Sequence, residues 1–434
     1  MIWNEEKAVS YSHGKIKYNS IYSLLIYVQI LFVVFYRLLL QYGAPSSITY
    51  ITDIINGLLF FGILKGHNRI GRFRRIIFIY LCLLIWGLLG ATIYGLSIPL
   101  YLWSMRNNIR FIVFAMACVY YLKMGDFKSI LNLLQNVMPL QTALVLFQYF
   151  VLHYNGDYLG GIFGTVMGAN LYVNLYMTLV FSYTVICYLR GKNKFKNLVA
   201  ITIQIILVAV LSELKFIFVE IIIIAAVAWI ISKKDSTQLG KAILIIAAGY
   251  IVISVSLPYL YKLYPDFEDF MNLDFIFAVH EQGYSMSGDL DRLSAIPIIT
   301  RKIFQNTPLR MIFGIGLGNA EYSSISFLCS QFYKQYGFLH YTWFSDAMMY
   351  LETGFVGIAL YVLSFITILF EALKKFRSNI RYAEIDGTIA VMCIMSMILV
   401  IYNQTLRTEA AYLLYFVFAA TFVKHENGVE YQDE

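Results

Sequence analysis

A long polar segment, residues 258–345, carries the side chains in this chain whose types and spacing best suit chemistry. Three arginines follow one another at intervals of nine residues: Arg292, Arg301 and Arg310. The glycine turn that comes next consists of Gly314, Ile315, Gly316, Leu317 and Gly318. Arginine stays cationic, and its planar fork binds phosphate oxygens in pairs. The pattern therefore predicts an anionic ligand, and a phosphate or pyrophosphate group fits it.

The residues around Arg292 have the pattern of an amphipathic helix. Asp289 suits the N-cap position, and a helix is predicted over 289–305. Its apolar face consists of Leu290, Leu293, Ile296 and Ile299. Arg292 and Arg301 are about half a turn out of phase on a straight helix, so they face one ligand only if the helix bends or ends between them. Pro297 is expected to bend it.

The rest of the chain is almost wholly apolar. Of its 434 residues, 59% are hydrophobic and 14% are charged, whereas about a quarter are charged in globular domains. Apolar runs of about 16 to 25 residues recur, and each can cross a hydrocarbon core of about 30 Å. We therefore predict an all-α polytopic membrane protein with about twelve transmembrane helices. The predicted spans are residues 20–40, 48–64, 76–96, 108–124, 138–152, 168–189, 198–212, 216–232, 242–257, 346–370, 387–402 and 410–423.

The distribution of lysine and arginine predicts the orientation of these spans. The two ends of the chain and the connections on one side hold 22 of the 33 Lys and Arg residues, and the short connections on the other side hold five. Positive residues favour the cytoplasmic side, so both termini are expected in the cytoplasm. The chain then divides into helices one to nine (1–257), an extracytoplasmic loop (258–345), and helices ten to twelve with a cytoplasmic tail (346–434).

The composition also argues against several kinds of site. The net charge of +7 comes from basic residues in the cytoplasmic connections, so no nucleic-acid partner is expected. Four of the five cysteines fall in apolar runs, and Cys329 stands alone in the loop. There is no CxxC motif and no Cys/His pair. Neither a redox motif nor a metal site is therefore expected.

Charged residues within a span cost about 2.5 kcal/mol or more each, so they are candidates for function. Those within spans are Asp53, Glu220 and Glu352. Glu213 and Lys215 lie at the tight turn between spans seven and eight, where an exposed ion pair at a helix end is an equally simple interpretation. Snorkelling explains the arginines that border the outer surface: Arg37, Arg106 and Arg110.

A glycine-rich stretch, GGIFGTVMGAN at 160–170, precedes the sixth span. Glycine lets backbones approach closely. The stretch is therefore either a tight start to a helix or one wall of a polar outer cavity, and Asn170 and Asn174 would supply polar groups to that wall.

Three stretches together resemble the Wzy-type superfamily of oligosaccharide repeat-unit polymerases and O-antigen ligases. The first is the glycine-rich stretch at 160–170, and the second is LSELKFIFVE at 211–220. The third and most specific is the Arg-led stretch with its glycine turn at 287–322, followed by HYTWFSDAMMYLETGFVGI at 340–358. A large external loop before the last few spans also fits this superfamily.

The resemblance implies a GT-C-like glycosyltransferase that needs no metal, nucleotide or other cofactor. Its expected substrates are a donor and an acceptor glycan linked to undecaprenyl pyrophosphate, at the outer face of a bacterial cytoplasmic membrane. The product would be O-antigen, capsule or exopolysaccharide. The other implied partners are the lipid bilayer, a flippase and a chain-length regulator.

The resemblance also implies roles for individual residues. Those expected to bind the pyrophosphate leaving group are Arg292 first, then Arg301 and Arg310, with Lys215 as a helper. The candidates for the general base that acts on the acceptor hydroxyl are His340 and Asp346. Those expected to line the cavity, or to bring the loop close to a ligand or a neighbouring span, are Gly314, Gly316, Gly318, Asn170 and Glu352.

The chain departs from the superfamily pattern in three places. Residues 153–167 contain no Lys or Arg, and Lys215 stands where arginine is commoner. His340 lies six residues before Asp346, whereas in a ligase the histidine is nearly adjacent to the span. This last difference favours a polymerase over a ligase.

A twelve-span transporter is the main alternative from another class. GHNRIGRFRR at 66–75 is similar to a major-facilitator loop motif, but Asn68 stands in place of its acidic residue. A polysaccharide flippase is the second alternative, although flippases generally lack one dominant external loop. A transporter is expected to show internal two-fold symmetry of its spans, and we find none in this sequence.

Overall fold

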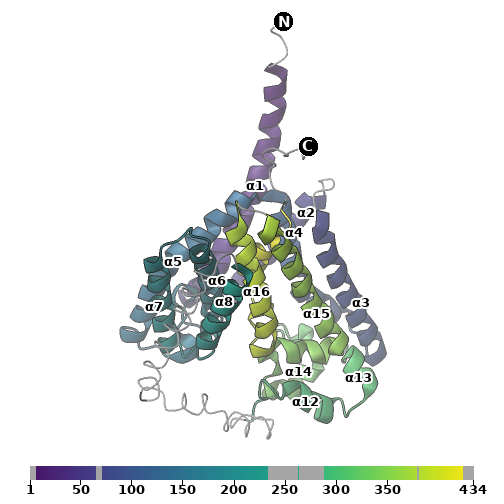
Figure 1. Cartoon of the computed structure of the whole chain (residues 1–434). Helices are drawn as coiled ribbons and strands as arrows, with labels where there is room; N and C mark the ends of the chain where they lie inside the picture. The colour runs from purple at the N-terminus through teal and green to yellow at the C-terminus, as the bar shows by residue number, and fades with distance from the viewer. Residues whose placement is uncertain (1–5, 65–70, 233–261, 263–287, 379–380, 424–434) are drawn as a thin grey trace.

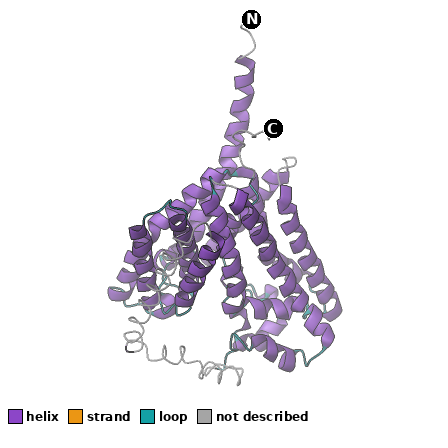
Figure 2. Cartoon of the chain, viewed as in Figure 1, coloured by secondary structure: helices purple, strands orange, loops and turns teal. Residues whose placement is uncertain are grey.

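The computed structural model describes residues 6–64, 71–232, 262, 288–378 and 381–423. In this part of the chain every regular element is a helix and no strand is present (Figure 2). The predicted all-α class is therefore confirmed for the described residues. In Figure 1 the N-terminal end of α1 (Glu6–Gln41) lies at the top, and the short helices α12 (Ala295–Ile298), α13 (Pro308–Phe313) and α14 (Gln331–Tyr336) lie at the opposite end.

The longer helices form a bundle between these two ends (Figure 1). In chain order they are α2 (Ile51–Leu64), α3 (Arg74–Tyr94), α4 (Ile98–Tyr121), α5 (Met124–Phe150), α6 (Ala169–Leu189), α7 (Phe195–Leu211), α8 (Ile217–Ser232), α15 (Ser345–Ser378), α16 (Ala383–Tyr402) and α17 (Ala411–Ala420).

Among the described helices, seven are long and apolar enough to cross a membrane: α1, α2, α3, α5, α6, α15 and α16. Three shorter apolar helices are α7, α8 and α17. Helix α4 has 24 residues, but Arg106 and Arg110 make it more polar. The span predicted at 242–257 lies outside the described residues. The helices are those of a polytopic membrane protein, and the total of twelve stays a prediction.

Helices α6, α16 and α17 lie in the interior of the bundle. All ten residues of α17 and nearly all of α6 are buried, as expected of helices that are apolar on every side. The hydroxyls of Thr178, Ser182 and Thr184 each donate to the carbonyl four residues earlier, at 2.7–2.8 Å. These bonds satisfy the hydroxyls within α6, so the helix needs no water at this depth.

Helix α15 is broken near its start, and the glycine turn fills the break. Gly354 has φ 63° and ψ −164°, outside the helical region. A break of this kind takes N–H partners away from the preceding carbonyls. The N–H groups of Ile315 and Gly316 donate instead to the carbonyls of Leu351 and Glu352, at 2.7 and 3.1 Å. The turn is therefore part of the α15 structure.

The same turn also packs against α3. The N–H of Leu317 donates to the carbonyl of Gly87 at 3.1 Å. Gly316 has φ 97°, and a Cβ there would overlap the backbone of Ala91. The turn is expected to lie close to a ligand or to a neighbouring span. The structure shows it close to a neighbouring helix, α3.

The helix predicted over 289–305 is wrong in its extent. The α-helical part, α12, begins only at Ala295, and residues Ile299–Ile303 continue as a π-helix. Pro297 falls in the first turn of α12, where proline is tolerated without a bend. The expected apolar face is also incomplete, because Leu293 is 57% exposed. Arg292 precedes the helix, so its phase relative to Arg301 no longer matters.

Candidate active site

Arg292 lies against the C-terminal end of α16. Its guanidinium carbon is 4.5 Å from the ring centroid of Tyr402. The same ring stacks with Phe216 at the start of α8, with centroids 4.1 Å apart. Lys215 directly precedes Phe216 and is half-buried. The structure thus places Arg292 and the turn that carries Lys215 on one aromatic residue.

Asp346 reaches the same place from α15. Its neighbour Ser345 donates its hydroxyl to the carbonyl of Asn403 at 2.7 Å, and Asn403 follows Tyr402 in the chain. The carboxylate of Asp346 is buried and accepts from the N–H of Ala347 at 2.7 Å. The end of α16 therefore holds the start of α15 beside the residue that contacts Arg292.

His340 is paired with an acidic residue. Its Nδ1 is hydrogen-bonded to a carboxylate oxygen of Asp289, and its ring stacks on Trp343 with centroids 4.1 Å apart. Asp289 is therefore not an N-cap as predicted. When Nδ1 carries the proton, it donates a hydrogen bond to Asp289, and Nε2 is then the basic nitrogen. This acidic partner is not evident from the sequence, where Asp289 has the pattern of a helix N-cap.

The other two loop arginines lie elsewhere. Nη1 of Arg310 donates to the carbonyl of Ile303 at 3.3 Å, and its guanidinium carbon lies 5.6 Å from the ring centroid of Tyr94 on α3. Arg301 is exposed, and its Nε lies 3.4 Å from the carbonyl of Pro297. The structure therefore does not gather the three arginines around one point.

All three loop arginines nevertheless share one electrostatic property. Within the described part of the chain, no carboxylate forms an ion pair with Arg292, Arg301 or Arg310. Their positive charges are thus available to an anion. Arg292 is the best placed of the three to bind an anion near the start of α15, because it lies beside Tyr402.

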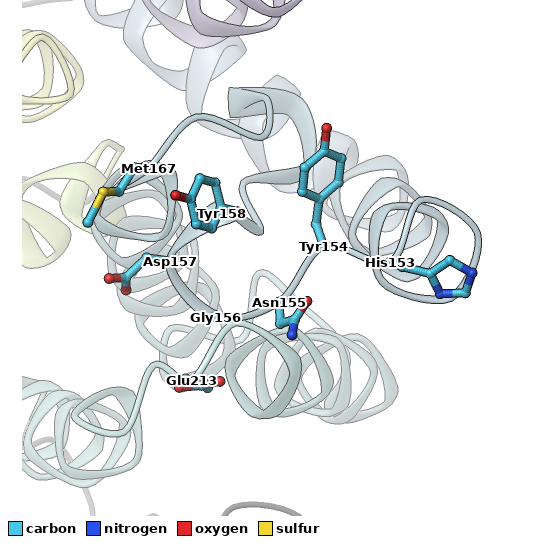
Figure 3. Close-up of a pocket in the computed structure, with 8 residues that line it drawn as sticks. All are labelled: His153, Tyr154, Asn155, Gly156, Asp157, Tyr158, Met167 and Glu213. Carbon is cyan, nitrogen blue, oxygen red and sulfur yellow. The ribbon is translucent and has the colours of Figure 1, made fainter.

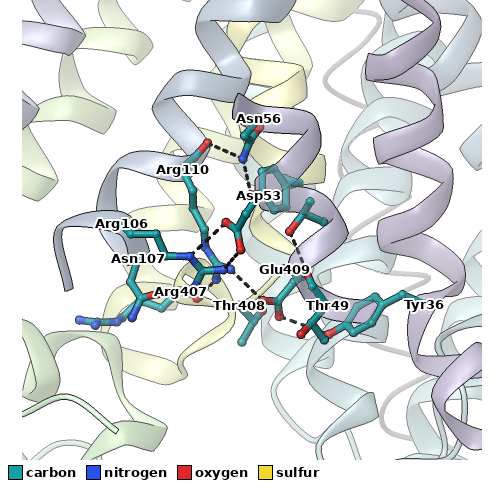
Figure 4. Close-up of polar contacts among 12 residues, drawn as sticks. Tyr36, Thr49, Asp53, Asn56, Arg106, Asn107, Arg110, Arg407, Thr408 and Glu409 are labelled. Carbon is teal, nitrogen blue, oxygen red and sulfur yellow. Dashed lines mark hydrogen bonds and ion pairs between the residues drawn. The ribbon is translucent and has the colours of Figure 1, made fainter. Parts of the chain in front are cut away.

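The arginines within the bundle are paired instead, in a network that the sequence analysis missed (Figure 4). Arg106 on α4 pairs with Asp53 on α2. One turn further along α4, Arg110 pairs with Glu409 at 2.8 Å and donates to the carbonyl of Arg407 at 3.0 Å. Snorkelling is the wrong explanation for Arg110, which is 6% exposed inside the bundle.

Glu409 is the acceptor that joins this network to two further helices. Besides Arg110, the hydroxyls of Tyr36 on α1 and Tyr172 on α6 donate to it, at 3.2 and 2.9 Å. Burial raises the pKa of Glu409, but the charge and hydrogen bond of Arg110 outweigh this effect and lower the pKa to about 2. Glu409 is therefore ionised near neutral pH.

Glu352 holds the glycine turn in place. It is buried, and its carboxylate accepts from the N–H of Gly318 at 2.8 Å and the hydroxyl of Ser104 at 3.0 Å. The same hydroxyl lies 3.2 Å from Glu321, which pairs with Arg407 at 2.7 Å. Glu352 thus links α15, α4 and the turn, and these contacts give it a positioning role.

These contacts converge on the α16–α17 connection, residues 403–410. Helices α1, α4, α6 and α15 and the loop residue Glu321 all bond to it, and Arg292 contacts the residue just before it. Its sequence, NQTLRTEA, is a short polar stretch between two apolar helices. This polarity is the one feature of the sequence that indicates that the connection makes many contacts.

A cavity of about 520 Å³ opens beside the start of α6 (Figure 3). Its lining consists of His153, Tyr154, Asn155, Gly156, Asp157, Tyr158, Met167 and Glu213. Asn170 lies behind it, buried, and donates to Asp157 at 2.5 Å. The expected role of Asn170 in a polar cavity wall is therefore indirect, through Asp157. We call this cavity the α5–α6 pocket.

No family model and no curated protein matches the chain. Membership of the Wzy-type superfamily accordingly stays a prediction. Among the described residues, no group of three or more His, Cys, Asp or Glu side chains is arranged to hold a metal ion.

Proposed function

We propose that this protein polymerises oligosaccharide repeat units linked to undecaprenyl pyrophosphate, at the outer face of a bacterial cytoplasmic membrane. The observation that carries the proposal is that Arg292, His340 and Asp346 are linked to one another through contacts of their chain neighbours. Leu290 donates to the carbonyl of Leu339 at 3.1 Å, which holds the strand-like segment before Arg292 against the residue before His340. Asp346 joins them through the contact of Ser345 with Asn403.

These three residues match what a glycosyl transfer from a pyrophosphate needs. In the proposed reaction the anomeric C–O bond to the pyrophosphate breaks, and the acceptor hydroxyl forms the new C–O bond. The leaving group carries its negative charge away, and Arg292 neutralises that charge. The hydroxyl proton passes to a general base. Nε2 of His340 is suited to receive it because Asp289 engages the other ring nitrogen, and Asp346 is the second candidate.

The location of the three residues also supports the proposal. The α-helices nearest to Arg292 and His340 in the chain, α12 and α14, lie in Figure 1 at the end of the bundle opposite the N-terminal end of α1. Positive-inside counting predicts that this end is extracytoplasmic. A lipid-linked substrate in the outer leaflet would meet Arg292 there. A ligase would use the same donor chemistry with a different acceptor, so the product distinguishes the two.

The test is complementation of a strain that lacks this gene and shows no ladder of surface glycan. Arg292→Ala at normal membrane abundance should give single repeat units without a ladder of surface glycan on a gel. Lys334→Ala is the matched control, since it removes an exposed cation of α14 in the same loop. A full ladder from Arg292→Ala would take this arginine out of the mechanism. Polymerised glycan that accumulates on the lipid carrier without transfer would indicate a ligase.

A further inference from the structure

The α5–α6 pocket has a chemistry opposite to that of the Arg292 region. Its described lining includes two carboxylates, Asp157 and Glu213, and contains no lysine or arginine. The two come from different elements, the loop before α6 and the turn between α7 and α8 (Figure 3). Like charges repel at short range. Asp157 forms no ion pair with a described residue, so its negative charge makes a phosphate or an acidic sugar a poor ligand for this pocket.

The backbone brings the two carboxylates to one pocket. Gly156 has φ 52° and is buried in the loop, and a Cβ there would lie 3.2 Å from Oε1 of Glu213. Asp157, the next residue, is held by the amide of Asn170. Glycine at 156 thus lets the loop lie directly on the α7–α8 turn, where a larger residue would push Glu213 away.

Two tyrosine rings, those of Tyr154 and Tyr158, also line the pocket. Tyr158 is 44% exposed, and its ring lies roughly parallel to that of Tyr154, with centroids 6.4 Å apart. The face of an aromatic ring is electron-rich and attracts C–H groups that carry partial positive charge. Carboxylates and the amide of Asn155 offer acceptors and donors for hydroxyl groups. A ring with apolar C–H faces and hydroxyl edges satisfies both kinds of surface.

We propose that the α5–α6 pocket binds an uncharged or amino sugar of the lipid-linked glycan. This inference rests on the proposed polymerase function and names the sugar class that its glycan subsite takes. The pocket is near the reaction site, because Glu213 and Phe216 belong to the same turn and Phe216 stacks on the ring that Arg292 contacts. A glycan whose pyrophosphate lies at Arg292 would extend its sugars toward this turn.

The test uses the full-length protein in lipid nanodiscs and four probes: galactose, N-acetylglucosamine, glucosamine and glucuronic acid. Saturation-transfer NMR measures the binding of each sugar. At least one of the first three should bind, and glucuronic acid should not. Tyr158→Ala should weaken that binding by about fivefold or more, while Tyr42→Ala, which removes a tyrosine that is 78% exposed and outside the pocket, should leave it unchanged.

Asp157→Asn, which keeps the size of the side chain, is the second variant. It should allow glucuronic acid to bind, because it removes the negative charge of Asp157. Absence of binding by all three non-acidic sugars, equal binding of glucuronic acid by the unaltered protein, or full binding by Tyr158→Ala would each overturn the proposal. The ladder assay separates the two hypotheses. If the unaltered gene restores the ladder but no sugar binds, only the pocket proposal fails. If sugar binds but the unaltered gene does not restore the ladder, only the polymerase proposal fails.

Discussion

Asp289 and His340 are 51 residues apart in the chain and form a hydrogen-bonded pair between the segment that precedes α12 and the segment that follows α14. The backbone bond between Leu290 and Leu339 runs beside this pair. Together they hold the segment that leads to Arg292 against the residues that lead to α15. In the proposed mechanism this pair contains the general base. The pair also joins the two segments of the site to each other.

We expect His340→Ala to slow polymer formation by about 100-fold to 10,000-fold, the usual contribution of a general base. Asp289→Asn should slow it less, since the imidazole remains but its orientation is less well defined. The rate is measured with purified protein and lipid-linked repeat units. An unchanged rate in His340→Ala, together with a large loss in Asp346→Ala, would make Asp346 the base.

Arg292→Lys should retain part of the activity that Arg292→Ala loses. Lysine keeps the positive charge but cannot bind two phosphate oxygens with a planar fork or stack in the same way on Tyr402. Polymer yield at equal membrane abundance should therefore fall in the order arginine, lysine, alanine. Equal yields for lysine and alanine would mean that the geometry of the fork, rather than the charge, is what the site requires.

Stability should depend on Glu409 at acidic pH. The pKa of this carboxyl falls from its ordinary value of 4.5 to about 2 in the folded protein, so the ionised form stabilises the fold. That contribution is complete above about pH 4.5 and is lost as the pH falls toward 2. The thermal midpoint of the unaltered protein should fall over this range, and Glu409→Gln should have a lower midpoint that depends less on pH.

The matched control for Glu409→Gln is Glu371→Gln. Glu371 pairs with Arg72 and Arg75, whose side chains are 55% and 66% exposed. Glu371→Gln leaves two arginines that are already largely in solvent, so it should cost about 1 kcal/mol or less. Leaving Arg110 buried without its partner should cost about 3–5 kcal/mol. Equal losses of stability would contradict a central role for the Arg110–Glu409 pair.

Gly316→Ala should destabilise the protein more than Gly43→Ala. Both glycines have similar positive φ, 97° and 91°, which costs alanine about 1–2 kcal/mol. A Cβ at Gly316 would also overlap Ala91 on α3, whereas a Cβ at Gly43 meets nothing within 4 Å. The difference between their thermal midpoints measures how tightly the glycine turn packs on α3. Equal midpoints would show that the turn can move away from α3.

Labelling of Cys329 tests the predicted orientation. This cysteine is half-buried in the loop, and three of the other four, Cys118, Cys187 and Cys393, are buried. A maleimide that cannot cross membranes should label intact cells or spheroplasts through Cys329, and Cys329→Ser should abolish the signal. Labelling that appears only after the membrane is opened would place the loop in the cytoplasm and refute the proposed site of action.

Local properties of the sequence determined the helical class and the approximate position of most spans. The hydrophobicity of a run such as 169–189 depends only on its own residues, and so does its ability to cross a membrane. The same reasoning selected Arg292, because arginine carries its charge wherever it lies, and the family resemblance added His340 and Asp346. It failed for 289–305, where a plausible cap residue and an apolar period concealed the pairing of Asp289 with a distant histidine.

Tertiary structure alone decided which of these residues meet. Arg110 pairs with Glu409, Glu352 accepts from the N–H of Gly318, and Asp157 and Glu213 line the same α5–α6 pocket. These partners are dozens to hundreds of residues apart, and no local pattern encodes them. Charged groups inside an apolar bundle must be neutralised by whichever groups the packing of helices brings near, so the network became visible only once that packing was known.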